Sequence, residues 1–465
     1  MDNIPNYKPT TELQALDSAH HLHPFTDGSA LKRKGTKVIT RASGVYLNDS
    51  EGNKLLDAMS GLWCVNIGYG RHELANVAQQ QMKQLPYYNT FFQTSHPPVI
   101  SLSEKLAEIS PSGFNNVFYG SSGSEANDTN IRICRHYWAA KGKPSKKTII
   151  SRHNSYHGST MGGASLGGMG YMHSQGGLPI PNITHIDQPY WYGEGGDTSP
   201  EEFGRERAQQ LEKKILELGE ENVAAFIAEP IQGAGGVIVP PKTYWPEIQK
   251  ICDSYEILLI ADEVICGFGR TGKLFGSETL NIKPDIMTIA KGLSSGYAPI
   301  AGSLICDEVA DTVNKAGEFS HGYTYSGHPV SCAVAMENIR ILEDEKIIEK
   351  AYSNTMPVLE RKWSELINHP LVGDVNILGF MGSIALTPHK SSRAKFSSPE
   401  GTVGLICREH CFSNNLIMRH VGDRMVISPP LIISSGEIEI LISRVIKSLD
   451  QTLSDIKSLG LYKVG

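Results

Sequence analysis

IMTIAKG, residues 286–292, is the stretch that decides the fold class. Its first five residues, Ile286–Ala290, form a short β-branched-rich run, which predicts a strand buried on both faces. Runs of the same kind occupy Thr148–Ser151, Val223–Ala228 and Ile257–Ala261. Amphipathic helical patterns lie between them, such as Glu201–Leu218 with its single apolar stripe. This alternation predicts an α/β fold, with a mostly parallel sheet flanked by helices over about residues 71–330.

The two ends of the chain show different patterns. Residues 11–70 begin with a helix-like stretch and continue with two alternating segments, Lys37–Leu47 and Lys54–Met59, as in a small antiparallel element. After Pro329 the sequence predicts a long helix, a strand-pair region and a terminal amphipathic helix, at Val330–Glu343, Ile377–Leu386 and Ser435–Leu459. We therefore predict a large domain at residues 71–330, and a smaller α+β domain built from residues 1–70 and 331–465.

Composition limits the class of function. With 465 residues, 40% hydrophobic and 20% charged, the chain is typical of a soluble globular enzyme with a large core. A net charge of −6 provides no broad basic field, so we expect no nucleic-acid partner. No signal peptide and no apolar stretch of about 18 residues is visible, which indicates a cytoplasmic protein without a membrane partner.

The cysteines give no sign of disulfide or metal chemistry. All eight are scattered through apolar surroundings, which predicts reduced core thiols. The tightest cluster, Cys407, His410 and Cys411, lacks a second pair of ligands at a suitable spacing. We therefore expect no metal.

A first candidate site lies in VFYGSSGSEANDTN, residues 117–130, where a strand leads through a small-residue turn into a helix. The unpaired amides at such a helix start attract anions, and Ser122, Gly123 and Ser124 offer hydroxyls and close backbone approach to a phosphate. An ordinary helix cap is the alternative, since Ser before Glu is a common helix start. The stretch is neither a P-loop nor a dinucleotide fingerprint, which disfavours nicotinamide chemistry.

Two charged residues end predicted strands. Asp262 follows Ile257–Ala261 and places a carboxylate at the edge of the sheet where open α/β folds bind ligands, although a loop-bracing acid is the alternative. Lys291 follows Ile286–Ala290, so its ammonium must either reach solvent or lose its charge through desolvation or covalent chemistry. A phosphate-binding helix start, a strand-end acid and a strand-end lysine are together the parts that a pyridoxal-phosphate site requires.

At these residues the chain resembles the class III pyridoxal-phosphate aminotransferases, the fold-type I group that contains the ω-amino acid:pyruvate enzymes. The resemblance covers nearly the whole chain. Its motifs stand in the order and spacing of that family: GSEAND at 123–128, NSYHG at 154–158, AEPIQGAGG at 228–236, ADEVICGFGRTGKLFG at 261–276, AKGLSSGY at 290–297 and YTYSGHP at 323–329. It implies a seven-stranded sheet in the large domain and pyridoxal 5′-phosphate as the cofactor.

The resemblance also implies roles for residues in the matching motifs. Lys291 would form the Schiff base and transfer the proton, Asp262 would pair with the pyridinium nitrogen, and Tyr156 and Val264 would pack on opposite faces of the ring. Ser122, Gly123 and Ser124 would hold the phosphate, and His157 would also contact the cofactor. Thr324 would reach the phosphate of a neighbouring subunit, which implies a homodimer with shared active sites and leaves a tetramer open.

Substrate contacts are implied in the same way. Trp63 resembles the tryptophan at the mouth of ω-transaminase pockets, Phe91 and Phe92 resemble aromatics that cross the dimer, and Tyr156 would also touch substrate. Arg419 matches a mobile arginine that binds the carboxylate of the keto acid, for which a planar guanidinium is suited because it bonds both oxygens. A surface arginine and ordinary core aromatics are the alternatives.

Within the class, Ile265 stands where 4-aminobutyrate and ornithine enzymes usually carry glutamine, which favours the pyruvate-using branch. Stretches such as HHLHPFTD and PYWYGEGGD look closest to bacterial putrescine–pyruvate (polyamine) aminotransferases. His153 departs from the tryptophan usual in those relatives, and Tyr119–Ser121 differs as well. We therefore expect ping-pong transfer of an amino group from putrescine or a related amine to pyruvate, giving an aldehyde and L-alanine. The alternatives are an ω-amino acid donor (β-alanine, taurine or 4-aminobutyrate), an aminomutase, and a non-catalytic protein that only binds the cofactor.

Overall fold

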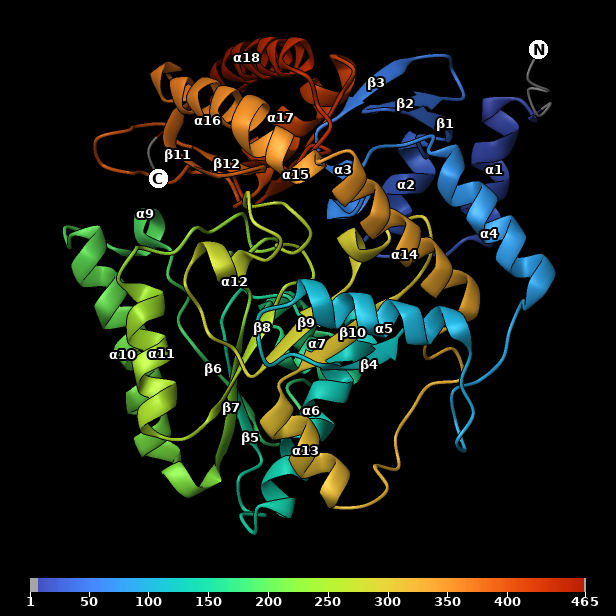
Figure 1. Ribbon diagram of the computed structural model, residues 1–465. Coiled ribbons are helices and arrows are strands. Elements are labelled where there is room, and N and C mark those ends of the chain that lie inside the picture. The colour runs from blue at the N-terminus through green and yellow to red at the C-terminus, as the bar shows by residue number, and fades with distance from the viewer. Residues whose placement is uncertain (1–6, 464–465) are drawn as a thin grey trace.

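A seven-stranded sheet forms the centre of the computed structural model, which describes residues 7–463 (Figure 1). Its strands follow the spatial order β4 (Asn116–Gly120), β10 (Ala301–Ile305), β9 (Ile286–Ile289), β8 (Leu258–Asp262), β7 (Val223–Ala228), β5 (Thr148–Arg152) and β6 (Ile183–Ile186). Strand β10 is antiparallel to both of its neighbours, and the pairs from β9 to β6 are all parallel. The predicted α/β class and mostly parallel seven-stranded sheet are confirmed.

Helices cover both faces of this sheet. Helices α6 (Gly123–Ala140) and α13 (Asp307–Lys315) pack on one face, and α10 (Pro200–Leu218) and α11 (Tyr244–Ser254) lie side by side on the other (Figure 1). Alternate residues of β7 enter the two hydrophobic clusters: Ala225 and Ile227 face α6, whereas Phe226 and Ala228 face α11. The strand is therefore apolar at every position because successive side chains point to opposite, equally buried faces.

The elements predicted from sequence are present with small shifts at their ends. The four predicted strands are β5, β7, β8 and β9, and each bound differs from the expected one by at most one residue. The predicted helices at residues 201–218, 330–343 and 435–459 are α10, α14 (Pro329–Asp344) and α18 (Ser435–Ser458). Helix ends are the least specific part of a periodic pattern, which accounts for these differences.

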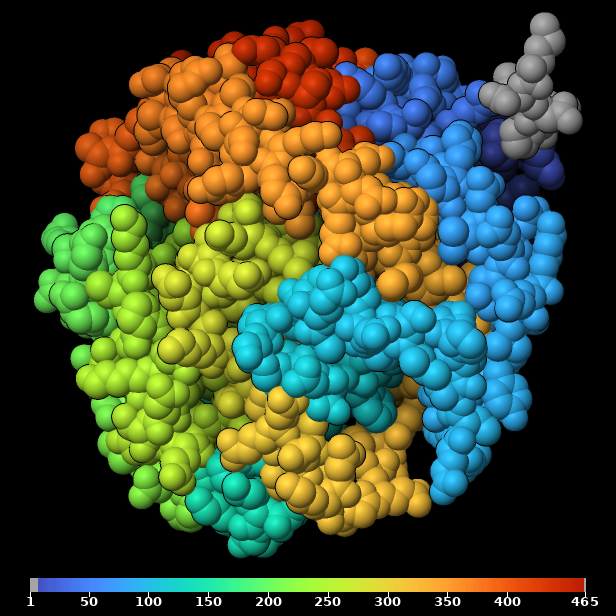
Figure 2. Space-filling view, viewed as in Figure 1, coloured from blue at the N-terminus to red at the C-terminus, as the bar shows by residue number. Residues whose placement is uncertain are grey.

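The two ends of the chain meet in a smaller sheet. Strands β1 (Ile39–Ser43), β2 (Tyr46–Asp49) and β3 (Lys54–Asp57) are antiparallel, and β13 (Leu416–Ile417) adds to β3 in parallel. Figure 2 shows this meeting as blue and red surfaces in contact at the top of the molecule. A second small sheet has the order β11 (Val372–Leu378), β12 (Met381–Leu386), β15 (Arg424–Ile427) and β14 (Arg419–Val421). The domain boundaries at residues 70 and 330 stay a prediction.

Twelve further α-helices lie within residues 7–463. They are α1 (Thr10–His20), α2 (Gly28–Lys34), α3 (Ser60–Trp63), α4 (His72–Gln84), α5 (Pro97–Ile109), α7 (Met161–Leu166), α8 (Gly170–Ser174), α9 (Trp191–Glu194), α12 (Gly276–Thr279), α15 (Ile347–Lys350), α16 (Met356–Ser364) and α17 (Thr402–Ser413). None of the helices within residues 7–463 is long and apolar enough to span a membrane. All eight cysteines are free thiols; six are buried, and Cys64 and Cys306 are partly exposed.

Candidate active site

A cavity of about 460 Å³ lies beside the carboxyl ends of β7, β8 and β9. This is the edge at which open α/β sheets bind ligands. The cavity is lined by Leu62, Ser121, Ser122, Gly123, Ser124, Asn127, Tyr156, His157, Gly158, Glu229, Asp262, Val264, Ile265, Ala290, Lys291, Ser294, Gly296, Ala298, Pro299 and Ile300. Every residue that the sequence analysis assigned to the cofactor of its own subunit is among them. They come from segments more than 160 residues apart in sequence, which the parallel strands bring to one edge.

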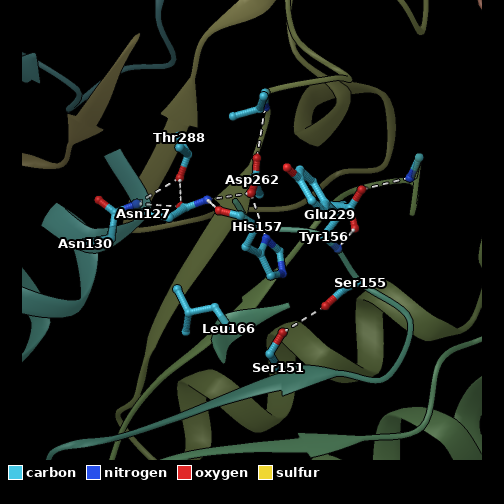
Figure 3. Close-up of polar contacts among 12 residues, drawn as sticks. Asn127, Asn130, Ser151, Ser155, Tyr156, His157, Leu166, Glu229, Asp262 and Thr288 are labelled. Carbon is cyan, nitrogen blue, oxygen red and sulfur yellow. Dashed lines mark hydrogen bonds and ion pairs between the residues drawn. The ribbon is translucent and has the colours of Figure 1, made fainter. Parts of the chain in front are cut away.

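Asp262, the last residue of β8, presents a buried carboxylate with three hydrogen-bond donors around it. Its Oδ2 accepts a hydrogen bond from Nδ2 of Asn127 at 2.8 Å and lies 2.7 Å from Nδ1 of His157 (Figure 3). Its Oδ1 accepts from the backbone N–H of Val264 at 3.1 Å. A buried carboxylate with this many donors is held in one orientation, with its negative charge stabilised by them.

Asn127 is itself fixed by a second layer of hydrogen bonds. Its Oδ1 accepts from Oγ1 of Thr288 at 2.8 Å and from Nδ2 of Asn130 at 3.2 Å, while its Nδ2 also donates to the backbone oxygen of His157. Because the amide oxygen is occupied by two donors, the NH₂ end must face Asp262. Figure 3 shows this network running from Thr288 on β9 to Asp262 on β8.

Lys291 lies two residues after the end of β9 and lines the same cavity. Its φ of +43° lies in the left-handed region, a conformation that is costly for a residue with a side chain and is often retained at functional sites. Burial lowers the pKa of the Lys291 ammonium, whereas the charges of Asp262 and Glu229 raise it. The neutral amine, which is the nucleophilic form, is therefore more accessible than in a solvated lysine.

The start of α6 forms another wall of the cavity. Ser122 caps this helix by accepting the N–H of Glu125 on its hydroxyl, and Oε2 of Glu125 accepts the N–H of Ser121. The first N–H groups of a helix have no intrahelical acceptor, so those of Gly123 and Ser124 are placed to bind an anion. A side chain at position 123 would lie 3.0 Å from Cγ2 of Val264, so a glycine suits this close approach.

Glu229 is a cavity residue that the sequence reasoning missed. It follows β7, is only 2% exposed, and accepts the N–H groups of Tyr156 and Gly233 on its two oxygens. Burial raises the pKa of this carboxyl, whereas nearby His157 lowers it. The signal was present, because Glu229 ends a buried strand in the same way as Asp262. Asn127, within the GSEAND segment, was missed as well.

Arg419 begins β14 and does not line the cavity, but its charge interacts with Tyr156, which does. Burial lowers the pKa of its guanidinium, and the neighbouring Tyr171 and Tyr156 raise it. The charge of Arg419 in turn contributes to lowering the pKa of Lys291. Among the described residues, none of the groups that shift the pKa of Arg419 is a carboxylate, so the guanidinium remains available for an anionic ligand.

Trp63 does not line the cavity in the single chain. It is 2% exposed and packs in a cluster with Ile265, which does line the cavity, while the neighbouring Leu62 is both exposed and cavity-lining. Its indole N–H has no partner among the described residues. Trp63 therefore supports the wall from behind in this arrangement.

Phe91, Phe92 and Thr324 also lie outside the cavity, on two loops that pack against each other. The hydroxyl of Tyr87 donates to the backbone oxygen of Thr324 at 2.8 Å, and a side chain at Gly322 would overlap the ring of Phe91. Phe92 is 91% exposed. These loops, residues 87–94 and 321–328, expose a group of aromatic rings that this chain does not cover: Tyr87, Tyr88, Phe92 and Tyr325.

The two departures from the resembling enzymes lie at different distances from the cavity. His153 is exposed, does not line the cavity and stacks on His185 with ring centroids 5.5 Å apart. Tyr119 is buried, and its hydroxyl lies 3.0 Å from Oγ of Ser103. Of the segment Tyr119–Ser121, Ser121 alone lines the cavity.

The chemistry of the lining fits the cofactor expected from sequence. A buried carboxylate, Asp262, suits a protonated ring nitrogen, and the amides and hydroxyls at the start of α6 suit a phosphate. Lys291 supplies an amine of lowered pKa in the same space. The residues present therefore match the ring, the phosphate and the aldehyde of pyridoxal phosphate.

Comparisons with known proteins agree with this site. A sequence model of the family described as aminotransferase class-III matches residues 30–449. The chain is 60% identical to a putrescine–pyruvate aminotransferase of Pseudomonas aeruginosa, covering 97% of this chain and 99% of that protein. It is 40% identical to a γ-aminobutyrate transaminase of Solanum lycopersicum, covering 99% and 89%.

Solved structures give the same result for the fold. An ω-transaminase from Pseudomonas jessenii in complex with PMP is 42% identical to this chain. It has a TM-score of 0.93 and covers 96% of this chain and 99% of the solved one. A thermostable (S)-enantioselective ω-transaminase from Thermomicrobium roseum, also 42% identical, gives 0.93 with coverage of 96% and 100%.

Proposed function

The chain belongs to the class III aminotransferases, which depend on pyridoxal phosphate, and on that premise we propose that it transfers an amino group from putrescine or a related amine to pyruvate. The products are an aldehyde and L-alanine. The observation that carries this proposal is the convergence of Lys291, Asp262 and the start of α6 on one cavity. The choice of amine and acceptor is supported by the full-length similarity to a putrescine–pyruvate aminotransferase.

Different residues of the cavity hold different parts of the cofactor. Ser122, Gly123 and Ser124 bind the phosphate, and Asp262 keeps a proton on the ring nitrogen. Tyr156 and Val264 cover the two faces of the ring, and His157 positions Asp262 through the contact of its Nδ1 with Oδ2. When bound, the cofactor supplies an aldehyde that takes up an amino group and a ring that withdraws electrons from the carbon bearing that group.

Lys291 and Arg419 serve the two half-reactions. Nζ of Lys291 removes the proton from Cα of the amine in the first half-reaction and returns a proton to Cα in the second, as a general base and then a general acid. Its lowered pKa brings it closer to the neutral form that accepts this proton. Arg419 binds the carboxylate of pyruvate through paired hydrogen bonds, which the amine, lacking a carboxylate, does not need.

Among the residues that line this cavity, no carboxylate is free to pair with the distal ammonium of a diamine. Glu229 and Asp262 are the acidic residues among those that line it, and both are already engaged by protein donors. We therefore expect no charged contact to the distal ammonium from the residues that line this cavity. On this basis 1-aminobutane, which lacks the second ammonium, is also a substrate.

We also propose that the enzyme is a homodimer with shared sites. The exposed aromatic loops at residues 87–94 and 321–328, with Phe92 91% exposed, are the support for this. In a dimer, Phe91, Phe92 and Thr324 would complete the site of the other subunit. Pairing of dimers into tetramers and a cytoplasmic location stay predictions.

The deciding experiment measures alanine formation from pyruvate by the cofactor-loaded enzyme. The donors are putrescine, cadaverine, spermidine, 1-aminobutane, β-alanine, taurine and 4-aminobutyrate. Lys291→Ala serves as the blank, and Lys283→Ala, an exposed lysine before the same strand, serves as the matched control. Activity with the diamines in wild type and in Lys283→Ala supports the proposal.

Other results have distinct meanings. If β-alanine, taurine or 4-aminobutyrate leads, the donor is an ω-amino acid and the reaction stands. If putrescine is consumed without net transfer to any keto acid, an aminomutase reaction replaces the proposal. If no donor reacts with any keto acid although the cofactor is bound, the chain is a non-catalytic binding protein.

A further inference from the structure

Three side chains at the end of α1 converge outside the active site. Asp17 and His21 stand one helical turn apart at the end of α1, and His23 follows after Leu22, which is 95% exposed. Nδ1 of His21 lies 3.3 Å from Oδ1 of Asp17, and Nε2 of His23 lies 2.8 Å from Oδ2 of Asp17. One ligand atom from each of the three residues lies within 4.8 Å of the others.

We propose that Asp17, His21 and His23 form a binding site for a divalent transition-metal ion of the zinc class. Two imidazoles and one carboxylate are a donor set that such ions accept, with water in the remaining position. Bonds of about 2.0–2.1 Å in a tetrahedral site place ligand atoms about 3.3 Å apart. The observed separations of 3.3 and 2.8 Å are equal to this value and about 0.5 Å below it, so small side-chain rotations suffice.

The surroundings are compatible with entry of an ion. The side chain of His21 is 58% exposed, whereas those of Asp17 and His23 are 22% and 21% exposed. A surface hollow of about 510 Å³ adjoins the cluster and is lined by residues 18–23, together with Thr26–Ser29, Leu31 and Lys32. The two carboxylate oxygens of Asp17 each face one of the histidines, so either oxygen is placed to serve as a ligand.

The site has a structural consequence for the neighbouring loop. His23 is followed by Pro24 and Phe25, and the ring of Phe25 lies edge-on to that of Tyr156 with centroids 6.3 Å apart. An ion held by both Asp17 and His23 joins the end of α1 to the segment that contacts this cavity residue. The metal site itself is independent of the proposed reaction.

The test is titration of the cofactor-loaded enzyme with Zn²⁺ by calorimetry, and with Co²⁺ by visible absorption. Wild type is expected to bind about one ion per chain and to give the strong visible bands of a four-coordinate cobalt site. His23→Ala and Asp17→Asn are each expected to weaken binding by about tenfold or more, since each removes one of three ligands. Mg²⁺, which prefers oxygen ligands, is expected to produce no saturable heat.

His20→Ala is the matched control, because His20 is an exposed histidine of the same helix that is outside the cluster. It is expected to bind Zn²⁺ as wild type does. Equal loss in His20→Ala and His23→Ala would overturn the proposal, because it would show general binding by surface histidines. Absence of saturable Zn²⁺ binding to wild type would overturn it as well, and would leave the cluster as a hydrogen-bonded end of α1. Circular dichroism of each variant verifies that α1 and the rest of the fold are intact.

Discussion

Nδ1 of His157 lies 2.7 Å from Oδ2 of Asp262, and both side chains are buried. The two residues are 105 positions apart, and each comes from a loop or strand end at the same edge of the sheet. We therefore propose that His157 is a positioning residue that orients the Asp262 carboxylate, in addition to lining the cavity.

His157→Phe should test this role, because it keeps a ring and removes the N–H donor. A hydrogen bond to a charged group contributes about 1.5–3 kcal/mol, equal to about tenfold or more in rate, so we expect kcat to fall by that factor. The absorbance of the bound cofactor should also change its dependence on pH. His136→Phe on α6, away from the cavity, should alter neither. An unchanged absorbance profile in His157→Phe would reduce the residue to a packing role.

Arg419→Ala should separate the two half-reactions. The pyruvate half-reaction is expected to slow by about tenfold or more because a charge-assisted carboxylate contact is lost. The half-reaction with putrescine should change little. Stopped-flow absorbance of the bound cofactor follows each half-reaction in the same preparation. Equal losses in both would show that Arg419 supports the site structure and does not bind the carboxylate.

Gly123→Ala should weaken cofactor retention. The new Cβ would lie 3.0 Å from Cγ2 of Val264, so either the start of α6 or the valine must move, and both belong to the cofactor site. We expect faster loss of cofactor on dialysis at unchanged fold. Gly436→Ala is the matched control, since nothing lies within 4 Å of its Cβ position in the first turn of α18. Identical retention in both variants would contradict the phosphate assignment.

Mixing two defective chains should test the shared site. Lys291→Ala removes the amine, and Thr324→Ala removes a proposed contact to the phosphate of the partner site. After random reassociation half of the dimers are hybrids. Each hybrid has one site in which both Lys291 and Thr324 are present. About a quarter of all sites are therefore restored, which is measured at limiting cofactor. Activity of the mixture is compared with that of each variant alone. No gain after verified subunit exchange would exclude a role for Thr324 across the dimer.

Acid sensitivity should depend on His185, which stacks on His153. Burial and, to a smaller extent, the neighbouring His153 together lower the pKa of His185 from 6.5 to about 4. The unfolded chain binds a proton below pH 6.5 that the folded chain does not, so this residue reduces the free energy of unfolding as pH falls from 6.5 to about 4. His185→Gln should lose less Tm over that range than wild type, whereas exposed His20→Gln should follow wild type. A parallel loss in all three would contradict this assignment.

Site residues were predictable where a charged residue follows an apolar strand, because that pattern is visible within a short stretch of sequence. Lys291 and Asp262 end apolar strands, and a charge in that position is unusual enough to be noticed from sequence. The motifs of the family then supplied Tyr156, Val264 and Arg419. Glu229 carried the same strand-end signal, since it directly follows the predicted strand Val223–Ala228, and was missed.

The sequence by itself determined the α/β class and the strands, because hydrophobic periodicity is a local property of the chain, and its ordered motifs determined the family. Only the tertiary structure decided which groups face one another. The contact of Asn127 with Asp262 spans 135 residues, and the cluster at Asp17 depends on how the chain turns after α1. Such contacts depend on strand order and loop path, which arise from packing of the whole core and are not encoded in any one segment.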